Sequence, residues 1–136
     1  MAKARLLVVD DSPDDRDLMQ RRLGKLGYDV TLAADGEAGL ALIADGTFDL
    51  VILDLMMPGI DGMEALRRLR AIHSAEQLPV IMVTGVFDMA TQEMAGELGA
   101  NHFILKPVVI EVVEKWIEKL LHGAEAHAWL QDASAS

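Results

Sequence analysis

Short, mostly apolar runs recur along the chain, and each is followed by a segment with a different periodicity. Continuous apolar runs of this length are typical of strands buried on both faces of a sheet. A further segment alternates Tyr28, Val30 and Leu32 with polar residues, which indicates a less buried strand at or near an edge. The continuous runs are residues 6–9, 50–53, 79–83 and 102–105.

Segments with helical spacing of apolar residues lie between these predicted strands. The first begins at Ser12-Pro13-Asp14-Asp15, which combines an N-cap residue, a proline at the first helical position and an acidic first turn. We therefore place Asp14 and Asp15 on a helix, and we expect them to lie outside any functional site. The alternation, repeated five times, predicts an α/β fold with a parallel sheet covered on both faces. The spaced residues are Met19, Leu23 and Leu26; Leu40 and Ile43; Met63, Leu66 and Leu69; and Val109, Val112, Val113, Trp116, Ile117, Leu120 and Leu121.

Composition limits the classes of protein to consider. The 136 residues suffice for one domain of ordinary size. The formal charge of −10 argues against a nucleic-acid or anionic membrane partner, and we expect neither. The absence of cysteine fits a reducing cytoplasm, which is the predicted location. No apolar stretch approaches the roughly 18 residues of a membrane span.

Polar residues follow the ends of four predicted strands. Asp10 and Asp11 follow the first, Asp54 the third, Thr84 the fourth and Lys106 the last. In open parallel sheets, ligands bind beyond the carboxyl ends of the strands, where the strand order reverses. Any one of these residues alone has an ordinary interpretation as a helix cap or a solvated charge. All of them on one rim predict a functional site.

Clustered carboxylates repel one another unless a cation neutralises them, so this rim predicts a metal. Ligands with oxygen donors only, and no nearby His or Cys, suit Mg²⁺ with positions open for phosphate oxygens. A carboxylate can itself attack phosphorus, while a metal, a hydroxyl and a lysine balance the phosphoryl oxygens. The residue set therefore favours phosphoryl transfer to an aspartate.

Four separated motifs also resemble the receiver domain of two-component response regulators. They are Asp10-Asp11, the stretch from Asp54 to Gly62, Thr84-Gly85 and Lys106-Pro107. The resemblance implies a flavodoxin-like, doubly wound sheet with strand order 2-1-3-4-5 and five helices. We assign residues 1–122 to the receiver domain and 123–136 to a C-terminal tail, which we expect to be mobile. This ending favours a stand-alone, single-domain regulator.

The resemblance also implies roles for individual residues. Asp54 would be the phosphoacceptor, and Thr84 and Lys106 would bind the phosphoryl group. Thr84 and Phe103 would act as switch residues. Mg²⁺ would be held by Asp54, by Asp11 directly, by Asp10 through water and by the backbone carbonyl of Met56. On this interpretation the chain is not an enzyme, apart from catalysing its own phosphorylation and slow dephosphorylation.

The implied partners are a sensor histidine kinase or histidine phosphotransfer protein, and a downstream protein target. The target would bind the face made by the fourth helix, the fifth strand and the fifth helix. Residues 108–110, Val-Val-Ile, are more apolar than this helix start usually is in the family. They either enlarge an exposed sticky patch or belong to a better-buried last helix.

Other functional classes remain as alternatives. A metal-dependent phosphatase with an aspartate nucleophile needs similar residues, but its usual acidic partner two residues after the nucleophile is missing at Met56. A pseudo-receiver that only mediates assembly would not take up phosphate. A flavin protein would need a less anionic loop than residues 10–15, and no Walker-type glycine loop supports direct use of ATP.

Met56 and Val86 flank the phosphoryl position in the resembled family. A thioether and an isopropyl group offer no good hydrogen bond to an attacking water. Because a misplaced reactant can slow a reaction on the order of 10²-fold, we expect a long-lived phosphoryl group. The alternative is that both are loop residues without a kinetic role.

Overall fold

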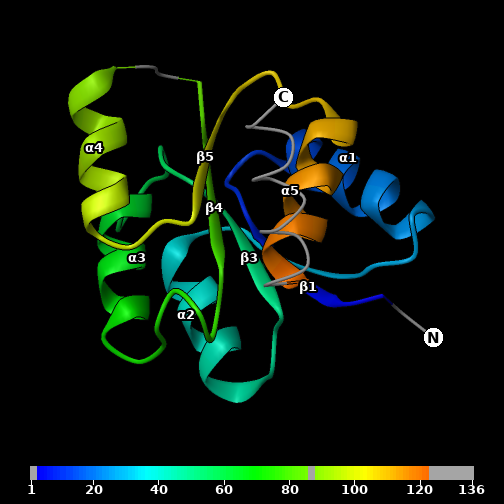
Figure 1. Ribbon diagram of the computed structural model, residues 1–136, viewed down its shortest axis with the longest axis horizontal. Helices are drawn as coiled ribbons and strands as arrows, with labels where there is room; N and C mark the ends of the chain where they lie inside the picture. Colours follow the sequence, from blue (N-terminus) through cyan, green and yellow to red (C-terminus); the bar gives the residue numbers. More distant parts are fainter. Residues whose placement is uncertain (1–2, 86–87, 123–136) are drawn as a thin grey trace, which may run out of the picture.

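The structure, a computed structural model, describes residues 3–85 and 88–122. Within these residues, five parallel strands form one sheet in the order β2-β1-β3-β4-β5 (Figure 1). This order confirms the predicted flavodoxin-like topology and places β2 at an edge. The strands are β1 (Arg5–Val9), β2 (Asp29–Ala33), β3 (Leu50–Asp54), β4 (Val80–Thr84) and β5 (His102–Leu105).

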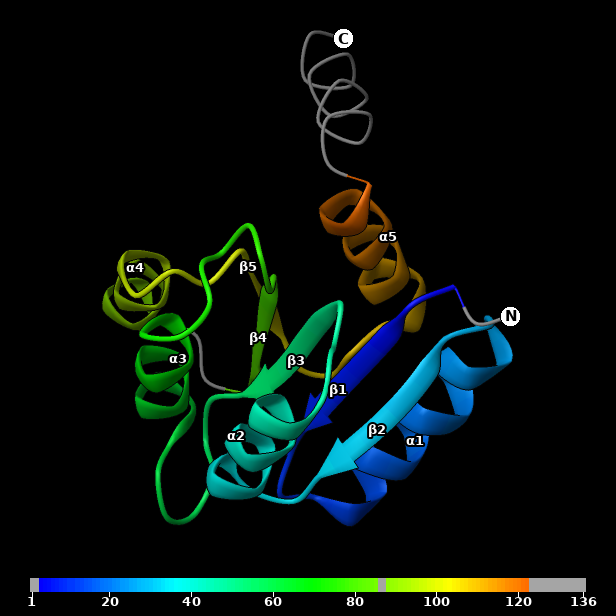
Figure 2. The ribbon, with the colours of Figure 1, turned by 90° about the horizontal axis from the view of Figure 1, so that it is seen from below.

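Helices cover both faces of the sheet. Helices α1 and α5 pack on one face, and α2, α3 and α4 pack on the other (Figure 2). Their bounds are α1 (Pro13–Lys25), α2 (Gly36–Asp45), α3 (Gly62–Arg70), α4 (Met89–Glu97) and α5 (Ile110–Leu121). The predicted alternation of strands and helices is therefore confirmed for the described residues.

Two apolar cores flank the central strands because successive side chains of a strand point to opposite faces. On β1, Leu6 and Val8 join the core beneath α1 and α5, whereas Leu7 and Val9 join the core beneath the other helices. Strands β3 and β4 are buried along their whole length. Each fully buried Leu, Val or Ile stabilises the fold by about 1.5–3 kcal/mol. Burial on both faces explains why these strands read as continuous apolar runs.

Side-chain caps start four of the helices. In each, the side chain of the N-cap residue accepts a hydrogen bond from the backbone N–H three residues on, which satisfies a donor that the helix leaves unpaired. Ser12 confirms the predicted start of α1, with Pro13 at the first helical position. The capping residues are Ser12, Asp35, Asp61 and Asp88.

The apolar residues 108–110, at the start of α5, are partly buried and partly exposed. Ile110 is buried in the core and Val108 is half-buried against it, so part of the segment serves packing. Val109 is 53% exposed and Val112 is 41% exposed. Both expectations are therefore met in part: the segment packs into the core under α5 and also adds exposed apolar surface.

The described residues include no helix that is both long enough and apolar enough to span a bilayer. The predicted tail, 123–136, lies outside the described residues, as do Val86 and Phe87. The proposed domain boundary after residue 122 stays a prediction.

Arg70, near the end of α3, ties three parts of the chain together. Its guanidinium donates to the carbonyl oxygens of Gly99 at 2.9 Å and Leu78 at 2.8 Å, and to Oδ1 of Asn101 at 2.9 Å. The same Oδ1 accepts from the N–H of Val80. At Gly99, φ is +102°, and a Cβ would lie 2.9 Å from Nε of Arg70, so only glycine suits both the turn and this contact. The arginine thereby fixes the amino ends of β4 and β5.

We predict that Arg70→Met lowers the free energy of unfolding by about 2–3 kcal/mol, because partly buried carbonyl groups lose a charged donor. Arg21→Met is the matched control, since Arg21 makes an exposed ion pair with Asp17 that is worth no more than about 0.5 kcal/mol. Urea unfolding of both variants checks this. Equal losses in the two variants would contradict the role assigned to Arg70.

Candidate functional site

Two buried aspartates lie side by side at the carboxyl edge of the sheet. Asp54 ends β3 and Asp10 directly follows the neighbouring β1, and they are 4% and 6% exposed. Each carboxylate accepts a hydrogen bond from the backbone N–H two residues on, Asp10 from Ser12 at 2.9 Å and Asp54 from Met56 at 3.2 Å. These two local turns, one after each strand, fix the orientation of the carboxylates.

Asp11 completes an acidic group at this edge. One carboxylate oxygen from each of Asp10, Asp11 and Asp54 lies within 4.8 Å of the other two. Asp11 is exposed, whereas the other two are buried. Oxygen-only donors at this separation, open to solvent on one side, fit a hard divalent cation that keeps some of its waters.

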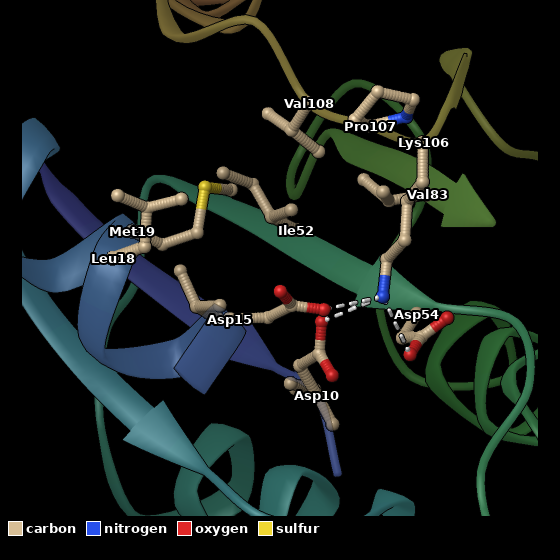
Figure 3. Close-up of a pocket in the computed structure, with 12 residues that line it drawn as sticks. Asp10, Asp15, Leu18, Met19, Ile52, Asp54, Val83, Lys106, Pro107 and Val108 are labelled. Carbon is tan, nitrogen blue, oxygen red and sulfur yellow. Dashed lines mark hydrogen bonds and ion pairs between the residues drawn. The ribbon is translucent and has the colours of Figure 1, made fainter. Parts of the chain in front are cut away.

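Lys106 supplies the positive charge of the site. It follows β5, and its side chain reaches across the edge of the sheet toward the aspartates (Figure 3). Its Nζ lies 3.2 Å from Oδ2 of Asp10, 3.3 Å from Oδ2 of Asp54 and 2.9 Å from Oδ2 of Asp15. A cavity of about 140 Å³ beside it is lined by these groups, by apolar residues of α1, β1, β3 and β4, and by Pro107 and Val108.

The surroundings of the site shift two pKa values upward. Burial, and then the charge of Asp10, raise the pKa of Asp54 from 3.8 to about 6, although Lys106 and the Met56 N–H act in the opposite direction. Burial lowers the pKa of Lys106, but the hydrogen bond to Asp15 and the charges of Asp10 and Asp54 outweigh it and raise that pKa above its ordinary value. The lysine therefore stays charged, and Asp54 ionises less readily than an ordinary aspartate, so additional positive charge would favour its ionised form.

Gly62 controls the backbone around Asp54. It begins α3, and its N–H donates to the carbonyl oxygen of Leu55 at 2.9 Å. A Cβ at this position would collide with the carbonyl oxygen of Asp54 and lie 2.7 Å from Cα of Leu55. The close approach of α3 to the end of β3 therefore requires glycine.

Of the remaining predicted site residues, Thr84 and Met56 lie at the same end of the sheet, whereas Phe103 lies earlier on β5, opposite Met82. Thr84 is fully buried at the end of β4, and its carbonyl oxygen accepts from the N–H of Lys106 at 2.7 Å. Met56 places its backbone N–H on Asp54, while its side chain is 60% exposed. Phe103 is half-buried on β5 and packs against the core beneath α2, α3 and α4.

One residue of this site was not predicted from the sequence. We expected Asp15 on the first helix and outside the site, but its carboxylate makes the shortest ion pair of Lys106. Asp15 does lie on α1, so the helix assignment holds and the exclusion from the site is wrong. The side chain of Lys106 reaches Asp15 from the end of β5, and a single sequence gives no signal of that long-range contact.

Comparison with known proteins identifies the family. The family model described as "Response regulator receiver domain" matches residues 6–118, most of the chain. The chain belongs to this family. The chemotaxis protein CheY4 of Vibrio cholerae is 31% identical, with a TM-score of 0.82 over 88% of this chain and 100% of that one. The response regulator protein TrrA of Thermotoga maritima, solved in complex with Mg²⁺ and BeF, is 31% identical, with a TM-score of 0.78 over 87% of this chain and 99% of that one.

Curated relatives of this receiver domain include regulators of transcription. The probable transcriptional regulator ycf27 of Porphyridium aerugineum is 38% identical over 92% of this chain and 51% of its own length. The transcriptional regulatory protein AfsQ1 of Streptomyces coelicolor is 37% identical over 88% of this chain and 52% of its own. The chain thus spans about half the length of these relatives.

The exclusion of nucleic acid from the partners is wrong. It rested on the charge of −10, but several relatives of the receiver domain are named regulators of transcription. The charge describes only the residues of this chain, and these relatives are about twice as long as the stretch that matches. The net negative charge of a receiver domain is therefore no evidence against nucleic-acid binding in the signalling system to which the domain belongs.

We predict that Asp54→Asn stabilises the fold increasingly as the pH rises, in protein kept free of metal by a chelator. Because the folded pKa of Asp54 exceeds the ordinary value of 3.8, ionisation destabilises the folded state, and this penalty grows between about pH 4 and pH 6. The variant should therefore match wild type near pH 4 and gain about 1–3 kcal/mol above pH 7. Urea unfolding across this range, with Asp14→Asn as the control, measures the gain. A gain that is the same at every pH would count against the assignment.

Proposed function

We propose that this receiver domain accepts a phosphoryl group on Asp54 from a phosphohistidine donor and signals by a shift between two conformations. The observation that carries the proposal is the position of Asp54. It lies buried at the end of the central strand, beside Asp10 and Asp11 and 3.3 Å from the Lys106 ammonium. A carboxylate held in this way is a nucleophile surrounded by groups that balance phosphoryl charge.

The same residues fit Mg²⁺. Asp10, Asp11 and Asp54 supply oxygen donors within 4.8 Å of one another, and the Met56 carbonyl would add a neutral one. By resemblance to the family, Asp10 would bind through water; its carboxylate oxygens accept hydrogen bonds from the N–H of Ser12 and from Lys106. When bound, Mg²⁺ would supply positive charge that offsets the carboxylates and the phosphoryl oxygens.

The transfer itself requires little from the chain beyond positioning. An Asp54 oxygen forms a bond to phosphorus while the bond from phosphorus to the donor imidazole nitrogen breaks. The electron pair of the broken bond stays on that nitrogen. Lys106 and the hydroxyl of Thr84 would bind phosphoryl oxygens, because Thr84 ends β4, which pairs with β3, and the Lys106 ammonium lies 3.3 Å from Asp54. The charged Lys106 stabilises the extra negative charge that the product carries.

The signal would be read on the face made by α4, β5 and α5, where a sensor kinase's message passes to a downstream target. Thr84 pairs with Leu105 in the sheet, which links the phosphoryl-binding edge to β5. Leu105, Val109 and Val112 are exposed apolar side chains on this face. Phosphorylation would then favour one of two existing arrangements of Thr84 and Phe103.

The predicted long lifetime of the phosphoryl group stays a prediction. The side chain of Met56 is 60% exposed, beside the mouth of the site, where it offers no strong hydrogen bond to water. Its proposed counterpart, Val86, lies outside the described residues. The predicted cytoplasmic location likewise stays a prediction.

Phosphorylation at Asp54 is tested with acetyl phosphate and Mg²⁺, read by intact mass. We expect wild type to gain one phosphoryl group and Asp54→Asn to gain none, because the amide is not a nucleophile toward phosphorus. Asp61→Asn, which changes an exposed helix cap, should label like wild type. Undiminished labelling of Asp54→Asn would refute the site, and an unlabelled wild type would favour a pseudo-receiver that only mediates assembly.

The metal assignment predicts that Asp11→Ala weakens Mg²⁺ binding by about ten-fold or more, as loss of a ligand usually does. Asp14→Ala removes an equal charge from the exposed first turn of α1 and should change the affinity far less. Calorimetric titration with MgCl₂ compares the two. Equal losses would mean that Asp11 contributes only general negative charge.

A further inference from the structure

All three N–H groups of the Lys106 ammonium face carboxylates, and the shortest contact is to a residue outside the metal cluster. Nζ lies 2.9 Å from Asp15, against 3.2 Å from Asp10 and 3.3 Å from Asp54. An ammonium has only three donors, so no N–H remains for a further acceptor in this arrangement. Figure 3 shows the Asp15 carboxylate, from α1, beside that of Asp10 to the left of the ammonium, with Asp54 below it and to the right.

The capping of α1 leaves the Asp15 carboxylate free for this contact. An acid three residues after an N-cap serine often accepts from the backbone N–H of that serine. Here the N–H of Ser12 donates instead to Asp10, while the N–H of Asp15 donates to Oγ of Ser12. The backbone N–H of Asp15 thus completes the helix cap, and its side chain accepts a hydrogen bond from Lys106.

We propose that Asp15 is a positioning residue that holds Lys106 in the phosphate-free arrangement and opposes the phosphorylated state. The inference rests on the proposed phosphorylation of Asp54. A phosphoryl group on Asp54 must take an N–H of Lys106, and Asp15 anchors the ammonium on the α1 side of the site. Asp15 thereby sets how readily this receiver domain responds to phosphorylation.

The charge of Asp15 acts in the same direction as its hydrogen bond. A phosphoryl group adds negative charge to an edge that already holds Asp10 and Asp11, and Asp15 adds another negative charge next to the lysine that must offset it. The effect is limited, because the Asp15 side chain is 44% exposed and water screens its charge. We therefore expect a change of a few-fold rather than of orders of magnitude.

The test is the affinity for beryllofluoride, a phosphoryl mimic, at saturating MgCl₂. Asp15→Asn should bind it about two- to five-fold more tightly than wild type, the range expected for a partly exposed ion pair. Asp15→Ala should show the same direction. The control, Asp14→Asn, removes the same charge from the same helix turn, and its exposed side chain makes no hydrogen bond or ion pair within residues 3–85 and 88–122. It should bind like wild type.

A second readout separates positioning from a purely structural role. In ¹⁵N NMR without beryllofluoride, the Lys106 ammonium signal should shift in Asp15→Asn and stay unchanged in Asp14→Asn. Unchanged or weaker beryllofluoride binding by Asp15→Asn, or an equal gain in Asp14→Asn, would overturn the inference. Failure of wild type itself to bind beryllofluoride would contradict the proposed function instead, so the two failures are distinguishable.

Discussion

The ion pairs between Lys106 and the aspartates at the carboxyl edge of the sheet are the interaction on which the site depends. A parallel sheet brings the ends of β1 and β3 together, so buried Asp10 and Asp54 become neighbours whether or not their charges favour it. Burial, and then the repulsion from Asp10, raise the pKa of Asp54, and Lys106 only partly offsets the rise. The fold thus keeps an unbalanced negative charge at one place, which a cation can neutralise.

A rigid backbone holds the negatively charged groups of the site in fixed positions, ready to bind a ligand. The turn hydrogen bonds to Asp10 and Asp54 orient both carboxylates, and Gly62 lets α3 approach the end of β3 closely. Strands buried on both faces hold these turns in place. Groups that are positioned before a ligand arrives need no rearrangement to stabilise it, which is the main source of catalysis in phosphoryl transfer.

The strands and most of the site could be predicted because burial and topology leave marks in the sequence. An apolar run that ends in Asp54 or Thr84 indicates a buried strand and also marks where its polar carboxyl end lies. No apolar pattern was identified for α4, whose described residues bury only Ala95. The contact of Asp15 with Lys106 joins residues 91 positions apart and depends on how α1 packs, which no local pattern encodes. Net charge misled about nucleic acid because it describes one domain only.

The connection from Asp54 to the outer face runs through a short path in the backbone. The N–H of Lys106 donates to the Thr84 carbonyl oxygen at 2.7 Å, so the two residues proposed to bind the phosphoryl group are also hydrogen-bonded to each other. They end β4 and β5, and β5 has only four residues at the edge of the sheet. An edge strand paired on one side moves with less loss of packing than a central one. On the proposed function, a change in charge at Asp54 would therefore pass through β5 to the exposed Leu105 side chain.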